Sequence, residues 1–282
     1  MNLDVLVTYA AIVEHGSLAA AANRLHVTPS TVTARLQTLE RELGQSLINR
    51  SKTGAVPTAA GTRISHNVQT IVALWEQVQR TSALGNEITD HVTIGSDPDL
   101  WIGHGERLMT GLGVADLHVA RTVRHGSAEQ LAAWQRDGRI DLSLTYAPSP
   151  RADHTVWSLQ PDQLVLVADH PDRPTSFDPG YVFVEAGPAF ARDHTATFAA
   201  ADIARVTFAS ATAALTHLRS SGGSAYLPHR MVELDLERGT LHRLSDAPIF
   251  TRPVSLVAPT NADVRWPWFD TVLAEMAAHA PT

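Results

Sequence analysis

Apolar residues recur at helical spacing at the start of the chain. The first stripe consists of Leu3, Leu6, Val7, Ala10 and Val13. Positions three and four apart lie on one face of a helix, so this stripe predicts an amphipathic helix. Gly16 ends that helix, because glycine readily takes the left-handed conformation found at helix ends. Ser17 can cap a second, alanine-rich helix predicted over residues 18–25.

A third helix is predicted after Thr28, which can cap it, and Pro29 fits its first turn. Gly44 ends this helix, and its apolar stripe is Val32, Leu36, Leu39 and Leu43. The residues that fall largely off this stripe are Ser30, Thr31, Thr33, Ala34, Arg35 and Gln37. Two short helices joined by a turn predict a helix–turn–helix. The alternative is a three-helix packing unit with an ordinary solvated face.

Residues 47–56 predict two short strands joined by a tight turn at residues 52–54. Arg50 and Lys52 lie at the tip of this hairpin. A basic hairpin beside a helix–turn–helix is typical of a winged helix, in which the wing reaches phosphates or a minor groove.

A long helix is predicted from Thr58, its cap, to about Leu84. Its apolar residues are spaced 4, 3, 4 and 3 apart: Ile64, Val68, Ile71, Trp75 and Val78. This is a heptad seam, which favours pairing with a second copy of the helix. The alternative is a helix that lies on the next domain.

From residue 91 the pattern changes to short strands that alternate with helices. Strands are predicted at 91–95, 117–121, 141–146, 164–168, 181–185, 204–209, 225–228 and 254–258. Helices are predicted at 98–110, 127–137, 189–199, 211–220 and 268–279. Such alternation predicts an α/β body with mostly parallel strands, in one sheet or two lobes.

Composition narrows the function classes. The chain has 282 residues and no cysteine, which excludes disulfides, thiolate zinc sites and thiol nucleophiles. Residues 1–85 hold seven basic and five acidic residues, whereas the remainder holds 15 and 24, so only the head has a net positive charge. We expect a cytoplasmic protein, because no signal-peptide pattern or membrane-length apolar run is present.

Enzyme motifs are absent from the sequence. There is no G-x-S-x-G, H-E-x-x-H or G-x-x-x-x-G-K pattern. Gly103-His104-Gly105 begins like a dinucleotide fingerprint, but Leu108 stands where its last glycine belongs. The 14 histidines are scattered. We therefore expect no catalytic residues, metal site or cofactor; an enzyme would need a convergent acid, base or nucleophile cluster.

Several segments together resemble the LysR-type transcriptional regulators. In the head they are residues 16–28 (GSLAAAANRLHVT), 33–40 (TARLQTLE), 43–44, 47–50 (LINR) and 58–61 (TAAG). In the body they are residues 138–144 (GRIDLSL), 162–167 with 170–171, and 222–228 (GGSAYLP). Residues 181–198 resemble the HdfR-like branch. The chain departs from the family at Ile48, Thr33 and Pro57, where phenylalanine, serine and leucine are usual.

The resemblance implies a winged helix–turn–helix over residues 1–58 and a dimerising linker helix over 59–86. It also implies a two-lobed, periplasmic-binding-protein-like effector domain over 87–282. Lobe I would span about 90–164 and 253–282, and lobe II about 165–252. Such regulators form dimers or tetramers, bind an inverted repeat in promoter DNA, and respond to a small molecule held between the lobes.

DNA recognition is then expected from the third helix and the wing. The candidate residues are Thr28, Pro29, Ser30, Thr31, Thr33, Ala34, Arg35, Arg50 and Lys52. Arg35 is the first choice, because a guanidinium can bind a guanine edge or a phosphate. The alternative for Arg35 is an ion pair with Glu40 or Glu42 of a partner turn.

An effector is expected where strand ends meet helix N-termini. The candidates are Ser96, Asp97, Trp101, Gly126, Ser127, Thr145, Tyr146, Ser210 and Thr212. Plain helix capping is the alternative for each Ser or Thr. Asp97 and Asp99 already place negative charge there, which favours a neutral or cationic ligand, although Arg124 and His125 of the neighbouring loop can compensate for part of that charge. A regulator whose effector domain binds no ligand is the competing hypothesis, and a cleft filled by side chains would indicate it.

Overall fold

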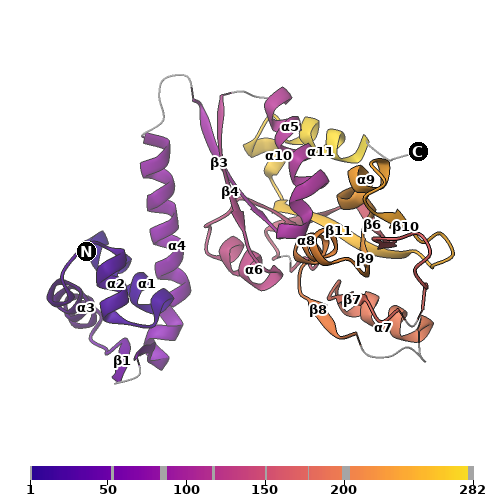
Figure 1. The fold of residues 1–282 in the computed structure, drawn as a ribbon. Coiled ribbons are helices and arrows are strands. Elements are labelled where there is room, and N and C mark those ends of the chain that lie inside the picture. Colours follow the sequence, from indigo (N-terminus) through magenta and orange to yellow (C-terminus); the bar gives the residue numbers. More distant parts are fainter. Residues whose placement is uncertain are drawn as a thin grey trace. The chain divides into compact units, whose positions relative to one another are not determined.

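The computed structural model describes residues 2–51, 54–82, 88–115, 118–149, 151–176, 178–198 and 204–278. The chain divides into two compact units, shown in Figure 1. The first unit comprises residues 1–91 with 133–140, and the second comprises residues 92–132 with 141–282. Parts of the predicted elements at residues 52–53, 83–87, 116–117, 199–203 and 279–282 lie outside the described residues.

The first unit opens with the three predicted helices. They are α1 (Leu3–His15), α2 (Leu18–Arg24) and α3 (Pro29–Leu43). The predicted caps are confirmed: the Ser17 side chain accepts from the Ala20 amide, and that of Thr28 from the Thr31 amide. Gly16 and Gly44 end α1 and α3 with φ of +61° and +67°. Local side-chain chemistry therefore fixes where these helices begin and end.

A hairpin of β1 (Ile48–Ser51) and β2 (Gly54–Pro57) forms the wing. Its base is tied to α3 by Glu40, whose Oε1 accepts from the amides of Leu47 at 2.8 Å and Ile48 at 3.3 Å. The same atom accepts from the Ser46 hydroxyl at 3.2 Å. A carboxylate that accepts several N–H and O–H groups holds them strongly. Glu40 therefore sets the wing relative to α3.

The long helix α4 (Ala59–Ser82) starts where predicted, because Thr58 Oγ1 accepts from the Gly61 amide at 3.0 Å. Gly61 packs tightly against the wing: an added Cβ would lie 2.2 Å from the Leu47 carbonyl oxygen. Tyr9 of α1 is fully buried and its hydroxyl bonds that of Ser65 at 2.9 Å. Thus α4 closes the core of the head.

The second unit contains a nine-stranded sheet in the order β4-β3-β5-β11-β6-β9-β7-β8, with β10 paired to β6. The strands are β3 (Asp90–Ser96), β4 (Val119–His125), β5 (Leu142–Thr145), β6 (His154–Ala168), β7 (Tyr181–Val184), β8 (Val206–Phe208), β9 (Ser224–Pro228), β10 (His242–Arg243) and β11 (Phe250–Pro259). The α-helices are α5 (Glu106–Ala115), α6 (Ala128–Arg136), α7 (Pro188–Thr197), α8 (Ala211–Ser221), α9 (His229–Glu237), α10 (Ala262–Arg265) and α11 (Phe269–Ala278). Residues 133–136 of α6 belong to the first unit.

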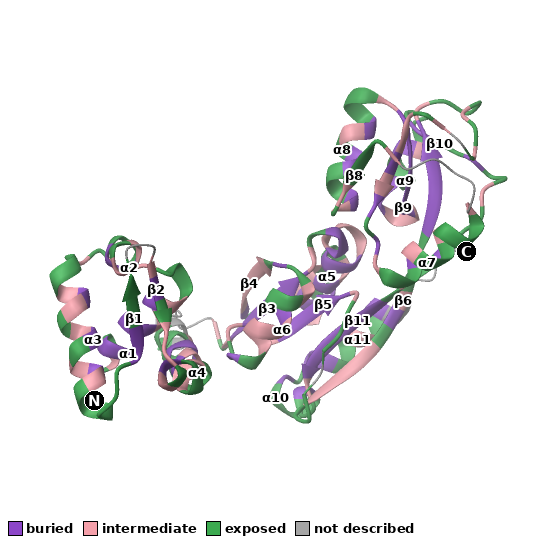
Figure 2. Cartoon of the chain, turned by 90° about the horizontal axis from the view of Figure 1, so that it is seen from below, coloured by how far each residue is buried: buried purple, intermediate pink, exposed green. Residues whose placement is uncertain are grey.

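Two long strands run through both lobes of this unit. Residues 154–159 of β6 pair with residues 254–259 of β11, beside β5 in lobe I. Farther along, residues 164–168 of β6 pair with β9 in lobe II, and this half of β6 is largely buried (Figure 2). Lobe I has one core around Trp266 and Phe269, whereas lobe II has separate cores on its two sides. The strands β6 and β11 therefore form the connection between the lobes.

Two predictions about this unit are wrong. The sheet is mixed: β3–β5, β7–β8 and β7–β9 are parallel, whereas β6 and β11 run antiparallel to their neighbours because they cross between lobes. The helix predicted over 98–110 is broken into a 3-10 turn (Pro98–Leu100), a π-type segment (Trp101–Gly105) and α5. Ile102 and Gly103 have non-helical dihedrals, and Gly103 takes φ +84°. The first half of β6, and α9, α10 and β10, were not predicted.

We expect Gly61→Ala to lower the melting temperature, because the new Cβ would meet backbone that cannot move cheaply; such overpacking costs about 1–3 kcal/mol. Gly113→Ala on α5 is the matched control, since its Cβ would meet only an arginine nitrogen at 3.9 Å and alanine favours a helix. Calorimetry of both variants checks this. A Gly61→Ala protein as stable as Gly113→Ala would contradict the packing argument.

Candidate functional site

The start of α3 presents small polar side chains to solvent. Thr28, Pro29, Ser30 and Ala34 are exposed, and Thr31 and Thr33 are half-buried. The opposite side of the helix is anchored in the core by Val32, Leu36 and Leu39. The candidate DNA-contacting residues of α3 therefore share one face. Thr28 is partly engaged there, because its hydroxyl caps α3 and lies 2.8 Å from both the Ser30 and the Thr31 hydroxyls.

Arg35 is bound to α1. Its Nη2 lies 2.7 Å from Asp4 Oδ2, and its Nη1 donates to Thr8 Oγ1 at 3.5 Å. The ion-pair partner is thus Asp4, and not Glu40 or Glu42 as the alternative for Arg35 had it. The side chains of Arg35 and Asp4 are 27% and 55% exposed, so solvent reaches this pair. Exposed pairs of this kind are worth about 0–1 kcal/mol, so Arg35 can leave Asp4 at low cost.

The wing contributes one described basic side chain. Arg50 is exposed on β1, whereas Lys52 lies outside the described residues.

The apolar seam of α4 divides into two parts. Ile64 and Val68 pack in the core of the head, so their burial is explained within one chain. Ile71, Trp75 and Val78 are 40%, 44% and 55% exposed, and Leu74 beside them is 53% exposed. We call the exposed set Ile71, Leu74, Trp75 and Val78 the α4 strip. A strip of large apolar side chains on one face is typical of a surface that packs on another molecule.

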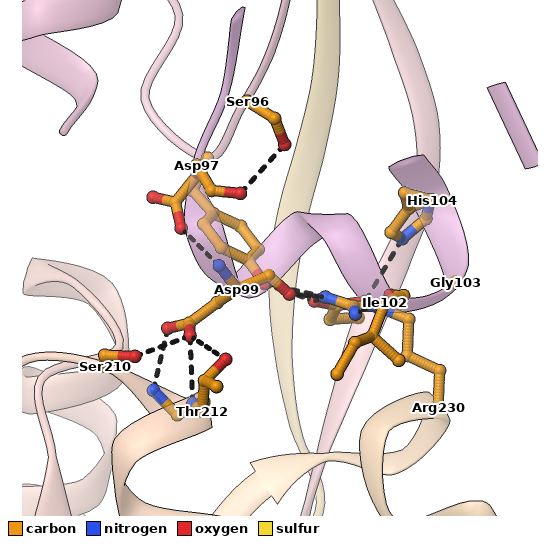
Figure 3. Close-up of polar contacts among 12 residues, drawn as sticks. Ser96, Asp97, Asp99, Ile102, Gly103, His104, Ser210, Thr212 and Arg230 are labelled. Atoms are coloured by element: carbon orange, nitrogen blue, oxygen red, sulfur yellow. Dashed lines mark hydrogen bonds and ion pairs between the residues drawn. The ribbon is translucent and has the colours of Figure 1, made fainter. Parts of the chain in front are cut away.

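The Asp99 carboxylate of lobe I accepts four hydrogen bonds from lobe II. Asp99 lies in the 3-10 turn after β3, and only 5% of it is exposed. Its Oδ1 accepts from the Ser210 hydroxyl at 2.8 Å and from the Thr212 amide and hydroxyl at 2.9 Å each. Its Oδ2 accepts from the Ala211 amide at 2.7 Å. Figure 3 shows this carboxylate of lobe I directed at the start of α8 in lobe II.

Arg230 forms a second connection between the lobes from the start of α9. Its guanidinium binds both oxygens of Asp162 at 2.7 Å, through Nε and Nη2. It also donates to the Asp99 carbonyl at 2.8 Å, the Tyr146 hydroxyl at 2.9 Å and the Ile102 carbonyl. All three guanidinium nitrogens of this largely buried side chain therefore donate to lobe I or to the crossing strand β6.

Asp162 is enclosed by these contacts. His104 Nε2 lies 3.2 Å from Oδ1, and the Tyr146 hydroxyl donates to Oδ2 at 2.6 Å. Burial alone would raise the pKa of Asp162, but the hydrogen bonds from His104, Arg230 and Tyr146 outweigh it and hold that pKa below its ordinary value. Burial and the Asp162 charge raise the pKa of the Tyr146 hydroxyl. Asp162 therefore stays ionised opposite Arg230.

The other predicted effector residues mostly serve local structure. The Ser96 hydroxyl donates to the Asp97 carbonyl, and Asp97 caps the 3-10 turn by accepting from the Asp99 amide at 3.0 Å. Burial raises the pKa of Asp97. Ser127 Oγ accepts from the Gln130 amide, as a cap of α6 does. The Gly126 amide donates to the Ser96 carbonyl, and Thr145 Oγ1 accepts from the Ala147 amide. The Trp101 ring lies against Gly105 and edge-on to His125.

An open cavity of about 720 Å³ is lined by residues of both lobes. It is lined from lobe I by Ser127, Ala128 and Glu129, and from lobe II by Phe183, Glu185, Gly187, Pro188 and Ala191. Of the predicted effector residues, only Ser127 lines it. Its ionisable lining residues, Glu129 and Glu185, are both exposed acids.

Sequence reasoning missed Asp4, Glu40, Asp162 and Arg230 as determinants of these sites. Asp99 was noted for its charge, but its contact with α8 was not predicted. Among the described residues, no group of three or more His, Asp or Glu side chains could hold a metal ion. No single helix in the described ranges is long and apolar enough to cross a membrane; only the bent pair α1 and α2 passes that test there, and it packs in the head core.

Two family models match the chain. Residues 3–62 match the bacterial regulatory helix-turn-helix protein model of the lysR family, and residues 85–266 match the LysR substrate binding domain. The chain is 25% identical over 270 residues to the transcriptional regulator HdfR of Salmonella typhimurium, covering 93% of this chain and 94% of that protein. This similarity agrees with the predicted resemblance to the HdfR-like branch.

Solved structures of similar fold span both units. ArgP from Mycobacterium tuberculosis is 24% identical, with a TM-score of 0.63 over 97% of this chain and 96% of that chain. Full-length CbnR in complex with its target DNA is 19% identical, with a TM-score of 0.68 over 99% of this chain and 100% of that chain. LysG from Corynebacterium glutamicum with bound effector Arg is 20% identical, with a TM-score of 0.56 over 98% of each chain.

The lowered pKa of Asp162 has a direct consequence for stability. The pKa of Asp162 in the folded protein lies below the unfolded value of about 3.9. The ionised carboxylate therefore adds to the free energy of unfolding above about pH 3.9, and this addition is lost as the pH falls from there toward the folded pKa. Asp162→Asn leaves Arg230 buried without a counter-charge, which costs about 3–5 kcal/mol. We expect a lower melting temperature at neutral pH and a weaker further loss on acidification.

Thermal unfolding at neutral pH and at about pH 3, below the unfolded pKa of the carboxyl group, checks this prediction. Asp153→Asn is the matched control, because that carboxylate is 64% exposed and should matter little. Equal melting temperatures for the two variants at neutral pH would contradict it.

Proposed function

The chain belongs to the LysR family of bacterial transcriptional regulators, and we propose that it recognises DNA with the first turns of α3. The observation that carries this proposal is the exposed face of small polar side chains there. Pro29, Ser30, Thr31, Thr33 and Ala34 are short enough to let α3 approach the base edges of a major groove. Glu40 holds the wing in place, so that Arg50 and Lys52 meet the phosphate backbone or the minor groove. Thr28 caps α3 at the DNA surface.

Arg35 moves from Asp4 to the DNA in this proposal. The exchange is favourable because the exposed pair contributes little, whereas a phosphate or guanine contact gains a charge-assisted hydrogen bond.

A gel-shift titration on the DNA upstream of the chain's own gene tests the role of Arg35. We expect Arg35→Ala to weaken DNA binding at least about ten-fold. The slope of the logarithm of the binding constant against the logarithm of the salt concentration should become shallower by about one. Asp4→Asn is the matched control: it frees Arg35, so it should bind at least as tightly as wild type. Equal losses in the two variants would instead show that Arg35 only positions α3 against α1.

The α4 strip pairs two copies of the chain in this proposal, which supports the inverted-repeat binding expected of a dimer. Val78→Glu buries a charge in that seam, so we expect dissociation toward monomers and weaker DNA binding. Gln79→Glu adds the same charge at the neighbouring exposed position, at the edge of the strip rather than within it, and should disturb assembly much less. Analytical ultracentrifugation distinguishes the variants. An unchanged oligomer for Val78→Glu would contradict pairing through the strip.

The effector is proposed to be a small neutral or cationic molecule that enters the open cavity lined by both lobes. Glu129 and Glu185 supply negative charge there, and the centre of the cleft already holds carboxylates. The structural relative LysG was solved with bound arginine, a cationic ligand. Calorimetric titration of cationic, neutral and anionic metabolite panels tests the assignment. Tight binding by simple carboxylates alone would overturn it.

A ligand-independent regulator is the second candidate. The observation in its favour is that Ser210, Thr212 and Tyr146 are all bound to side chains of the chain itself. In that case no member of the panels binds, while specific DNA binding persists.

A further inference from the structure

We propose that Asp99 is a built-in ligand: its carboxylate occupies the N-terminus of α8 as a bound anion would, and thereby holds the two lobes together without an effector. The proposal rests on the proposed function only in that this region is the cleft of the effector domain. It goes beyond that function because it assigns a regulatory contact within the chain.

The start of α8 is favourable for a negative group. A helix leaves its first amides without intrahelical partners, and its dipole places partial positive charge at that end. The helix α8 has 11 residues, and its first two amides, of Ala211 and Thr212, both donate to the Asp99 carboxylate. The Ser210 and Thr212 hydroxyls add two further donors. Four donors around one carboxylate are what a free anion would find at this site.

Asp99 is presented to α8 by a segment shaped for that purpose. Asp97 caps the 3-10 turn, which fixes the Asp99 backbone. From lobe II, Arg230 donates to the carbonyl of the same residue at 2.8 Å. The side chain and the main chain of Asp99 are therefore held by two different helices of lobe II.

The break after this turn is fitted to Arg230. Gly103 takes φ +84°, and an added Cβ there would lie 2.9 Å from Arg230 Cδ. The Ile102 carbonyl, freed by the break, accepts from Arg230 Nη1. A continuous helix would have kept that carbonyl in its own ladder. The irregular segment thus delivers both the Asp99 carboxylate and a backbone acceptor to lobe II.

Two consequences follow for ligand binding. In the wild-type chain, a free carboxylate has no place at the start of α8, because Asp99 already fills it. In an Asp99→Ala chain, the same donors become available to a small carboxylate from solvent, since Thr212 is exposed.

Formate rescue of Asp99→Ala tests the assignment in the full-length protein. We expect Asp99→Ala to melt at least about 4 °C below wild type, because four donors lose their acceptor. Replacing sodium chloride by sodium formate at equal ionic strength should recover part of that loss. The same exchange should leave wild type and Asp193→Ala, an exposed carboxylate of α7, unchanged.

Hydrogen exchange gives a second readout that does not depend on the size of the melting shift. The amides of Ala211 and Thr212 should be protected in wild type, although first-turn amides usually exchange quickly. They should lose protection in Asp99→Ala and regain it in formate. Asp99→Asn keeps an acceptor oxygen without the charge, so its amide protection should lie between that of wild type and that of Asp99→Ala. This variant replaces Asp99→Ala in the test if the alanine variant does not fold.

Two outcomes would overturn the proposal. The first is that wild type and Asp99→Ala have the same melting temperature and the same amide exchange. The second is that Asp99→Ala is as destabilised and as poorly protected in formate as in chloride. Both readouts are independent of DNA. A failure of the proposed DNA contacts would appear only in the gel shift, so the two failures are distinguishable.

Discussion

Asp162 and Arg230 form a buried ion pair at the point where β6 passes from lobe I to lobe II. Taking two charges out of water is costly, and the cost is offset only when the geometry is good and the remaining donors and acceptors are satisfied. Here Arg230 binds both carboxylate oxygens, and His104 and Tyr146 occupy their remaining positions. The partners come from the broken segment after β3, the end of β5, the middle of β6 and the start of α9.

The need to satisfy the remaining donors and acceptors of this buried ion pair determines the arrangement of the cleft. Two of the acceptors of Arg230, the carbonyls of Asp99 and Ile102, lie in the segment over residues 98–105, and the Asp99 carboxylate of the same segment binds the start of α8. The residues that could bind a polar effector are consequently engaged with one another. The open cavity has a different lining, which includes the exposed carboxylates Glu129 and Glu185. An effector domain with this arrangement carries anionic groups at its centre and along its rim, which is the basis for assigning it a neutral or cationic ligand.

Features set by neighbouring residues could be predicted from the sequence. Ser17 and Thr28 cap the helices that follow them, and Gly16 and Gly44 end the helices before them, because capping depends on a few adjacent backbone groups. Most strands and helices of the body also followed from local pattern, but the first half of β6, α9, α10 and β10 did not. The family resemblance supplied the two-lobed architecture, which local pattern left open between one sheet and two lobes.

Features set by distant residues could not be predicted in this way. Asp99 and Thr212 are 113 positions apart, and no local pattern pairs them. Without that pairing, residues 98–110 have the composition of an ordinary helix, and Ser210 has that of an ordinary cap. The α4 seam shows the same limit: its spacing is continuous, but Ile64 and Val68 belong to the head core and only the later positions remain exposed.

The central claim is that contacts within the chain hold the two lobes in one arrangement without a ligand. The chain has no cysteine, so two introduced cysteines would carry spin labels without background. Spin labels would be placed at exposed Asp263 in lobe I and at exposed Arg192 in lobe II. Pulsed electron paramagnetic resonance on labelled protein, diluted with unlabelled protein, would then report the distance between the lobes. The account predicts one narrow distance distribution in the ligand-free protein. A broad distribution, with lobes that sample open and closed arrangements, would contradict it.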